Sequence, residues 1–143
     1  METQVQISRI TQMVRDSKKF KARLVVTSKV TGKDLTFEMK GFKGRSGYTV
    51  MVGYESSYME FQYCALWNPD RAQVYPFNKY KTSDSTIIKG AMYVLKQICS
   101  GNLQNLMEQT SITHTGRCLQ CNRELTDAES IRIGFGPICR SNV

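Results

Sequence analysis

The chain has 143 residues, which is room for one domain of ordinary size or for a small domain with a metal-stapled appendage. Twenty Lys and Arg residues against twelve Asp and Glu residues give a formal net charge of +8, which favours an anionic partner, nucleic acid before a membrane surface. No apolar stretch approaches the roughly 18 residues of a membrane-spanning helix, and the first residues lack the basic and apolar regions of a signal peptide. We therefore expect a cytoplasmic protein.

The first predicted element is a short amphipathic helix near the amino terminus. Apolar residues recur there at spacings of three and four, with basic residues at other positions: Ile7, Ile10, Met13 and Val14. The alternative is an arm that precedes the first strand.

Between residues 21 and about 78 the apolar pattern changes to a period of two, and β-branched and aromatic residues become frequent. Strands are predicted at residues 22–27, 34–39, 48–54, 59–67 and 71–77. Pro76 suits an edge strand, because proline cannot donate to a sheet ladder. These strands predict an antiparallel meander of four or five strands. The pattern leaves open whether the sheet stays open or closes towards a barrel.

The segment Gly41–Gly47 carries three glycines and two cations between the second and third predicted strands. Glycine-rich basic loops can bind phosphate, but this one lacks the G-x-x-x-x-G-K-[ST] spacing and precedes a strand pattern where a helix is required. We therefore predict a hairpin loop.

A change to helical periodicity follows the strands. Ser83 or Asp84 can cap a helix over about residues 84–100, whose apolar stripe should lie across one face of the sheet. A shorter amphipathic piece around Leu106 leads to the carboxyl end. The predicted fold class is therefore α+β, an antiparallel meander covered by a helix. We place a basic domain at residues 1–110 and a zinc-binding module at residues 111–143.

The carboxyl-terminal segment has the pattern H-x3-C-x2-C-x17-C, formed by His114, Cys118, Cys121 and Cys139. Three thiolates and one imidazole in so short a segment match the closed tetrahedron of a structural zinc site. The two-residue gap between Cys118 and Cys121 lets one tight turn aim both sulfurs at a single point. We predict one structural Zn²⁺ in a zinc knuckle of the zinc-finger kind, treble-clef-like or ribbon-like.

A catalytic zinc is disfavoured, because it keeps an open position for water that four protein ligands would fill. The H-x-E and P-C-x-x-C signature of zinc deaminases is also missing from the sequence. His114 is the weakest of the four ligands, since it lies in a polar stretch. If it points away, Asp127, Cys99, Cys64 or a water completes the shell. Otherwise Cys64 and Cys99 are expected to pack in the core as small hydrophobes.

Around these ligands the chain reads H-T-G-R-C-L-Q-C-N-R-E-L-T and then S-I-R-I-G-F-G-P-I-C, within residues 114–139. This resembles a carboxyl-terminal module of many small, largely uncharacterised bacteriophage-encoded proteins, of the form H-x-G-x-C-x-x-C-G-R-x-L-T followed by S-I-x-x-G-I-G-P-x-C. Asn122 replaces the usual Gly and Phe135 the usual Ile, and neither change touches a ligand. The resemblance implies a zinc module, a phage origin and the host-cell cytoplasm as location, but no reaction.

The charge is shared unevenly along the chain. Residues 1–110 hold sixteen Lys and Arg against nine Asp and Glu, and residues 111–143 hold four against three. Cations that contact phosphates beside aromatic rings that stack on bases are typical of a single-strand binder. The alternative is that the aromatics form the core and the lysines keep the protein soluble. The candidate nucleic-acid contacts are Lys18, Lys19, Lys21, Arg23, Lys40, Lys43, Arg45, Lys79, Lys81, Arg117, Arg123 and Arg140.

Two functions therefore stand. The first is a phage-encoded, zinc-containing accessory protein that binds nucleic acid, preferably single-stranded DNA or RNA. The alternative is a phage effector that binds an acidic surface of a host protein, such as a polymerase or a defence nuclease. An enzyme is not expected, because a single His, no acid pair beside the cysteines and no triad spacing leave no catalytic residue to nominate. The identity of the partner, the base preference and the oligomeric state stay open.

Overall fold

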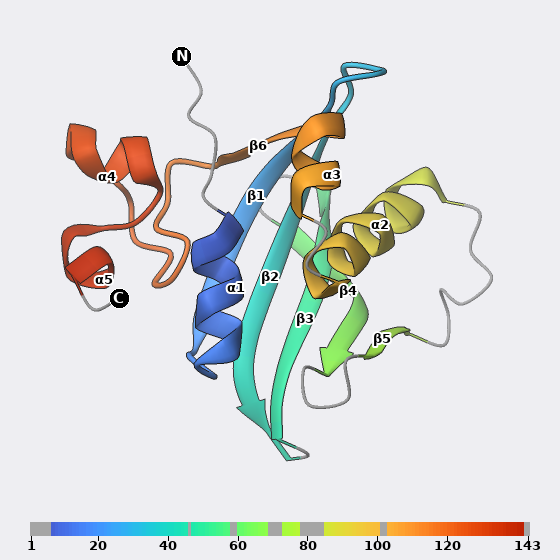
Figure 1. Ribbon diagram of the computed structural model, residues 1–143, viewed down its shortest axis with the longest axis horizontal. Coiled ribbons are helices and arrows are strands. Elements are labelled where there is room, and N and C mark those ends of the chain that lie inside the picture. The colour runs from blue at the N-terminus through green and yellow to red at the C-terminus, as the bar shows by residue number, and fades with distance from the viewer. Residues whose placement is uncertain are drawn as a thin grey trace.

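Figure 1 shows a computed structural model of the chain, in which helices lie over one face of a sheet and the carboxyl-terminal segment lies beside one edge. The structure describes residues 7–45, 47–57, 60–68, 73–77, 85–100 and 103–141. The predicted contacts Lys79 and Lys81, the predicted helix caps Ser83 and Asp84, and the side chain of Cys99 lie outside the described residues.

Six strands of the described chain form one antiparallel sheet in the order β5-β4-β3-β2-β1-β6. Their bounds are β1 Phe20–Ser28, β2 Asp34–Gly44, β3 Gly47–Ser57, β4 Glu60–Asn68, β5 Gln73–Pro76 and β6 Thr110–His114. The first five strands make the predicted meander, and Pro76 does lie in an edge strand. The predicted count of four or five strands is wrong, because β6 has a single apolar residue, Ile112, and so shows no alternating pattern. The predicted domain boundary after residue 110 falls inside β6.

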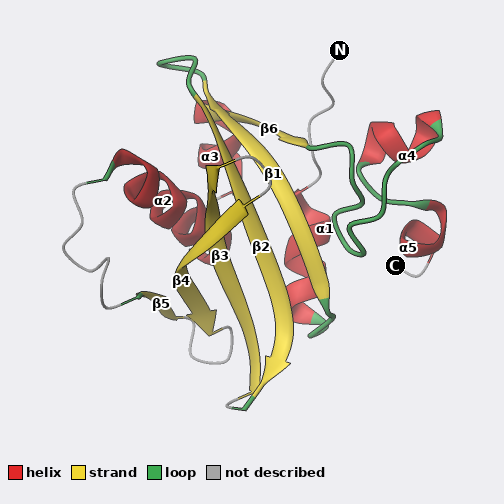
Figure 2. Ribbon diagram, turned by 180° about the vertical axis from the view of Figure 1, so that it is seen from behind, coloured by secondary structure: helices red, strands yellow, loops and turns green. Residues whose placement is uncertain are grey.

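Five helices are present in the described residues: α1 Ile7–Arg15, α2 Thr86–Ser100, α3 Leu103–Gln109, α4 Ala128–Ile133 and α5 Pro137–Ser141. In both views α1, α2 and α3 lie over the same face of the sheet, and no described helix covers the other face (Figure 1, Figure 2). The amino-terminal pattern therefore forms a helix rather than an arm, and α2 is the helix predicted over about 84–100. None of the described helices has the length and apolar character needed to cross a membrane.

The hydrophobic core lies between these helices and the sheet face they cover. Alternate residues of β1 point into it, as a period of two requires: Phe20, Ala22, Leu24 and Val26 are buried. Helix residues that meet them include Ile10, Ile88, Leu95 and Leu106. Burying one large aliphatic side chain contributes about 1.5–3 kcal/mol, so this layer is the main source of stability.

The predicted hairpin between β2 and β3 is present, but its loop is shorter than Gly41–Gly47, because β2 continues to Gly44 and β3 starts at Gly47. Gly41 has a packing role within β2: a Cβ there would overlap the ring of Phe20 and the hydroxyl of Tyr48. That hydroxyl donates to the carbonyl oxygen of Lys18 at 2.8 Å, which holds the Tyr48 ring in place. Phe20 and Tyr48 therefore pack against β2 in the space that a side chain at residue 41 would fill.

Gly41→Ala should lower the free energy of unfolding by about 1–3 kcal/mol, since the added methyl group overpacks the core. Gly44→Ala is the matched control on the same strand, because a Cβ there meets its nearest neighbour at 3.5 Å, an ordinary contact. Denaturant unfolding followed by circular dichroism gives both values. Equal stability of the two variants would mean that Phe20 and Tyr48 do not pack against Gly41.

The sheet face without helices is curled rather than flat. The pairing of β3 with β4 shifts register between Val52 and Gly53, and the first half of β4 turns across this face (Figure 2). Since Gly53 has no side chain, Tyr63 of β4 reaches over it and donates to Glu38 of β2 at 2.6 Å. Burial and this hydrogen bond raise the pKa of Tyr63 to about 12. The strand order still ends at β5 and β6, so the described sheet is open.

Candidate metal centre

The first two cysteines lie in a small hairpin between β6 and α4. The N–H of Cys118 donates to the carbonyl oxygen of Arg123 at 2.8 Å, and the N–H of Asn122 donates to that of Cys118 at 2.9 Å. Asn122 has φ of 64°, in the left-handed region that glycine and asparagine tolerate best. Asn122 therefore allows the turn that aims Cys121.

The third cysteine is positioned by two short helices. The side chain of Asp127 caps α4 by accepting the N–H of Ser130 at 3.0 Å, and Gly134 ends the helix with φ of 83°. Pro137 then occupies the first position of α5, where its missing N–H has no cost, and Cys139 lies in the first turn.

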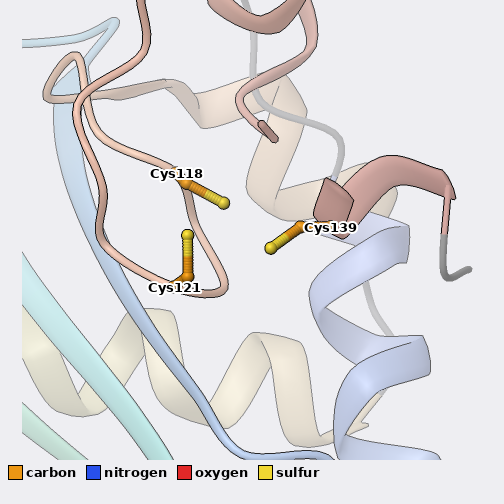
Figure 3. A group of neighbouring side chains, drawn as sticks. All are labelled: Cys118, Cys121 and Cys139. Atoms are coloured by element: carbon orange, nitrogen blue, oxygen red, sulfur yellow. The ribbon is translucent and has the colours of Figure 1, made fainter. Parts of the chain in front are cut away.

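Figure 3 shows the side chains of Cys118, Cys121 and Cys139 converging from these two segments. Their three Sγ atoms lie within 4.8 Å of one another. A tetrahedral zinc ion with Zn–S bonds of about 2.3 Å needs sulfurs about 3.8 Å apart, so small shifts would suffice to bind one. The trio could therefore hold a metal ion.

The electrostatics of the three thiols also favour a cation. Burial alone would raise the pKa of Cys118, but N–H donors outweigh it and lower that pKa, among them Gln120 and Gly136 at 3.4 Å from the sulfur. Burial and the neighbouring Cys118 and Cys121 sulfurs together raise the pKa of Cys139 to about 12. A thiolate at Cys118 therefore disfavours ionisation of Cys139 unless a positive charge lies between the two sulfurs. A divalent ion removes this conflict, since it binds thiolates and offsets their charge.

His114 lies outside this group of three. Its Nε2 donates to the carbonyl oxygen of Ile131 at 2.5 Å, and its Nδ1 accepts the N–H of Gly116 at 2.9 Å. Ile131 belongs to the last turn of α4, where carbonyl oxygens have no partner within the helix. In this structure His114 therefore caps α4, and three of the four predicted ligands come together.

Asp127 and Cys64, two other candidates for the fourth ligand, have partners elsewhere. Asp127 caps α4 and lies 3.5 Å from Nη1 of Arg140. Cys64 is fully buried in the sheet, where its thiol donates to the carbonyl oxygen of Val52 at 3.5 Å, and burial raises its pKa to about 11. The prediction that Cys64 packs in the core is confirmed.

The cysteine segment shares its core with the sheet, which the sequence pattern did not reveal. Phe135 is fully buried, and the guanidinium of Arg9 in α1 lies 4.6 Å from the centre of its ring. Arg9 also donates to the carbonyl oxygen of Arg140 at 3.3 Å. On the other side, the N–H of Lys21 in β1 donates to the carbonyl oxygen of Gln120 at 3.0 Å. The segment is thus held against both α1 and β1.

Among the predicted nucleic-acid contacts, the arginines Arg23, Arg117 and Arg140 have partners within the protein. Arg23 pairs with Glu38 at 2.9 Å, and its guanidinium lies over the ring of Phe61. Arg117 donates to the carbonyl oxygen of Asn122 at 3.1 Å, and Arg140 donates to the hydroxyl of Ser130 at 2.9 Å. These side chains stabilise the fold where they lie.

The remaining described candidates are spread over separate places. Lys43 and Arg45 are exposed at the turn between β2 and β3, and Arg123 is exposed on the cysteine hairpin. Lys18 is half-buried just before β1.

Lys19, Lys21 and Lys40 do come together, in a hollow of about 520 Å³ between the sheet and the cysteine segment. We call this hollow the lysine cleft. Lys21 and Lys40 are directly opposite each other on β1 and β2. No acidic residue is among the described residues that line it; the others are Phe20, Gln120, Cys121, Asn122 and Cys139.

The fold and the site together define an α+β protein with a carboxyl-terminal three-cysteine centre. Residues 109–143 match a family of unknown function (DUF6011), a stretch that spans β6, the three cysteines and both short helices. No curated protein and no solved structure matches the chain.

Serine variants of Cys118, Cys121 and Cys139 should each lose the bound metal, because two thiolates do not complete the site. Protein purified without chelator should carry about one metal ion per chain, and elemental analysis measures it. Cys64→Ala is the control, since that thiol lies in the sheet core. Equal metal content in Cys121→Ser and Cys64→Ala would rule the trio out as the metal site.

His114→Ala should keep the metal but destabilise the protein by about 0.5–1.5 kcal/mol, since the bond that caps α4 is lost. Elemental analysis and denaturant unfolding on the same preparation separate the two effects. Loss of metal as complete as in Cys121→Ser would instead place His114 in the coordination shell.

Proposed function

We propose that this protein is a phage-encoded, zinc-containing accessory protein that binds nucleic acid, preferably single-stranded DNA or RNA. Zinc is proposed for the three-cysteine centre because thiolates in a compact turn suit this ion. Its role would be structural, since a segment this small buries too little apolar surface to hold its own shape. The phage origin, and with it the host-cell cytoplasm, is supported by the resemblance at residues 114–139.

The observation that carries the binding role is the pairing of Lys21 with Lys40 on the helix-free face of the sheet. Like charges directly opposite each other on neighbouring strands destabilise a sheet, so this pair suits an anion that bridges it. Phe42 lies two residues along the same face, with Nζ of Lys40 5.9 Å from its ring centre. A cation pair beside a partly exposed ring offers contacts for both a phosphate and a base.

A single strand fits this arrangement better than a duplex. Stacking on a ring needs an unpaired base, and each stacked base contributes about 1–3 kcal/mol. In a duplex the bases are already stacked on one another, so only the phosphates would be left for the lysines. The effector alternative predicts instead a protein partner and no dependence on nucleic acid.

Binding is tested by fluorescence anisotropy with labelled single- and double-stranded oligonucleotides over a range of salt concentrations. We expect tighter binding to the single strand, with a logarithmic salt slope of about −0.7 for each phosphate that is neutralised. If the zinc-loaded protein binds neither oligonucleotide at low salt, the nucleic-acid role is wrong. A host protein retained from nuclease-treated lysate would then favour the effector role.

A further inference from the structure

We infer that the lysine cleft is a composite phosphate-binding site, whose affinity depends on the metal because the cysteine segment forms one of its walls. This inference rests on the proposed function, and it names where a phosphate of the strand lies. The cleft brings together three lysines from the start of β1 and from β2 with residues of the metal hairpin.

The sheet side of the cleft supplies positive charge that has no acidic counterpart in its lining. Lys19 is exposed, and Lys21 and Lys40 are partly exposed. On the same face of these two strands, the pair next to Lys21 and Lys40 is Arg23 and Glu38, so Glu38 is the neighbouring carboxylate. Its two oxygens already accept from Arg23 at 2.9 Å and from Tyr63 at 2.6 Å. A phosphate group, with several acceptor oxygens, could take donors from all three lysines.

The metal side of the cleft is tied to the same strand. The bond from the N–H of Lys21 to the carbonyl oxygen of Gln120 places the hairpin next to the lysine that it faces. Cys121 and Cys139 line the cleft and belong to the trio. These two residues come from different segments, which are joined by the bond from the N–H of Leu119 to the carbonyl oxygen of Gly134 at 2.9 Å, and a shared ion would tie the two cysteines together directly. Loss of the metal should therefore open the cleft without removing a single lysine.

The wall also contains polar atoms that have no partner. The side-chain oxygens of Gln120 and Asn122 are buried and make no hydrogen bond within the described structure. An unmet buried acceptor costs about 1–3 kcal/mol, and a phosphate oxygen cannot meet it because it is an acceptor too; a water or a sugar hydroxyl of the strand can donate here. A volume of about 520 Å³ is enough for a phosphate with its sugar, and it lies within the usual range for ligand pockets.

The test compares two variants that remove the same charge from different places. The first replaces the three cleft lysines: Lys19→Gln, Lys21→Gln and Lys40→Gln. The control replaces three exposed lysines of the β1–β2 turn and α2: Lys33→Gln, Lys89→Gln and Lys96→Gln. With zinc-loaded protein and labelled oligo-dT, the cleft variant should bind at least about tenfold more weakly, with a salt slope shallower by roughly two. The control should stay within about twofold of the parent protein.

Equal losses in the two variants would overturn the inference, because bulk charge alone would then account for binding. Chelation of the metal from the parent protein should weaken binding as much as the cleft variant does, while circular dichroism shows the sheet intact. Unchanged affinity after metal removal would overturn the metal dependence. The cleft variant could also lose zinc. If that loss alone explained its weaker binding, the lysines would stabilise the metal site and not bind phosphate, which would also overturn the inference.

A second probe keeps this test separate from the proposed function. Pyrophosphate alone should shift the amide NMR signals of Gln120 and Asn122 in the parent protein and leave them unchanged in the cleft variant. A parent protein that responds to pyrophosphate but binds no oligonucleotide would retain the phosphate site and refute the nucleic-acid role. If the parent protein binds oligonucleotide but neither pyrophosphate nor oligonucleotide shifts these signals, the lysine cleft is not the phosphate site, while the nucleic-acid role stands.

Discussion

The convergence of three sulfur atoms within 4.8 Å of one another is the feature on which the local structure of the carboxyl-terminal segment depends. Thiolates that close repel each other, so a cation among them would stabilise the arrangement. The turn at Asn122, the left-handed end of α4 at Gly134 and the proline that starts α5 all serve to aim these three side chains.

The same segment is not a separate appendage, because its apolar side chains complete the core of the sheet. Phe135 is buried beneath the guanidinium of Arg9, and Leu119 belongs to the same buried cluster as Phe20. A backbone bond between Lys21 and Gln120 joins the hairpin to β1. The position of the metal centre beside the strand is therefore set by packing and by backbone bonding together, and this places lysines next to cysteines that are about a hundred residues away in the sequence.

Basic residues of this protein have different roles according to what surrounds them. Arg23 and Lys21 are two residues apart on one face of β1, yet Arg23 is held by Glu38 and Phe61 while Lys21 lines a hollow without acids. The difference arises because Phe61 and Tyr63 of β4 contact the Arg23–Glu38 pair, whereas no described residue of β4 lines the hollow at Lys21. A count of basic residues cannot distinguish a cation that stabilises the fold from one that can meet a ligand.

The sequence by itself determined the α+β class, the five strands of the meander, the helix α2 and the three cysteines, because short-range periodicity and ligand spacing are properties of neighbouring residues. Tertiary structure decided what depends on distant residues: β6 became a strand only through its pairing with β1, and Gly41 proved to be a packing position only once Phe20 and Tyr48 met there. His114 is the clearest case, since its spacing suits a metal ligand while both of its nitrogens bond backbone groups near α4. The lysine cleft likewise exists only after the hairpin packs on β1, because its walls come from segments that no local pattern connects.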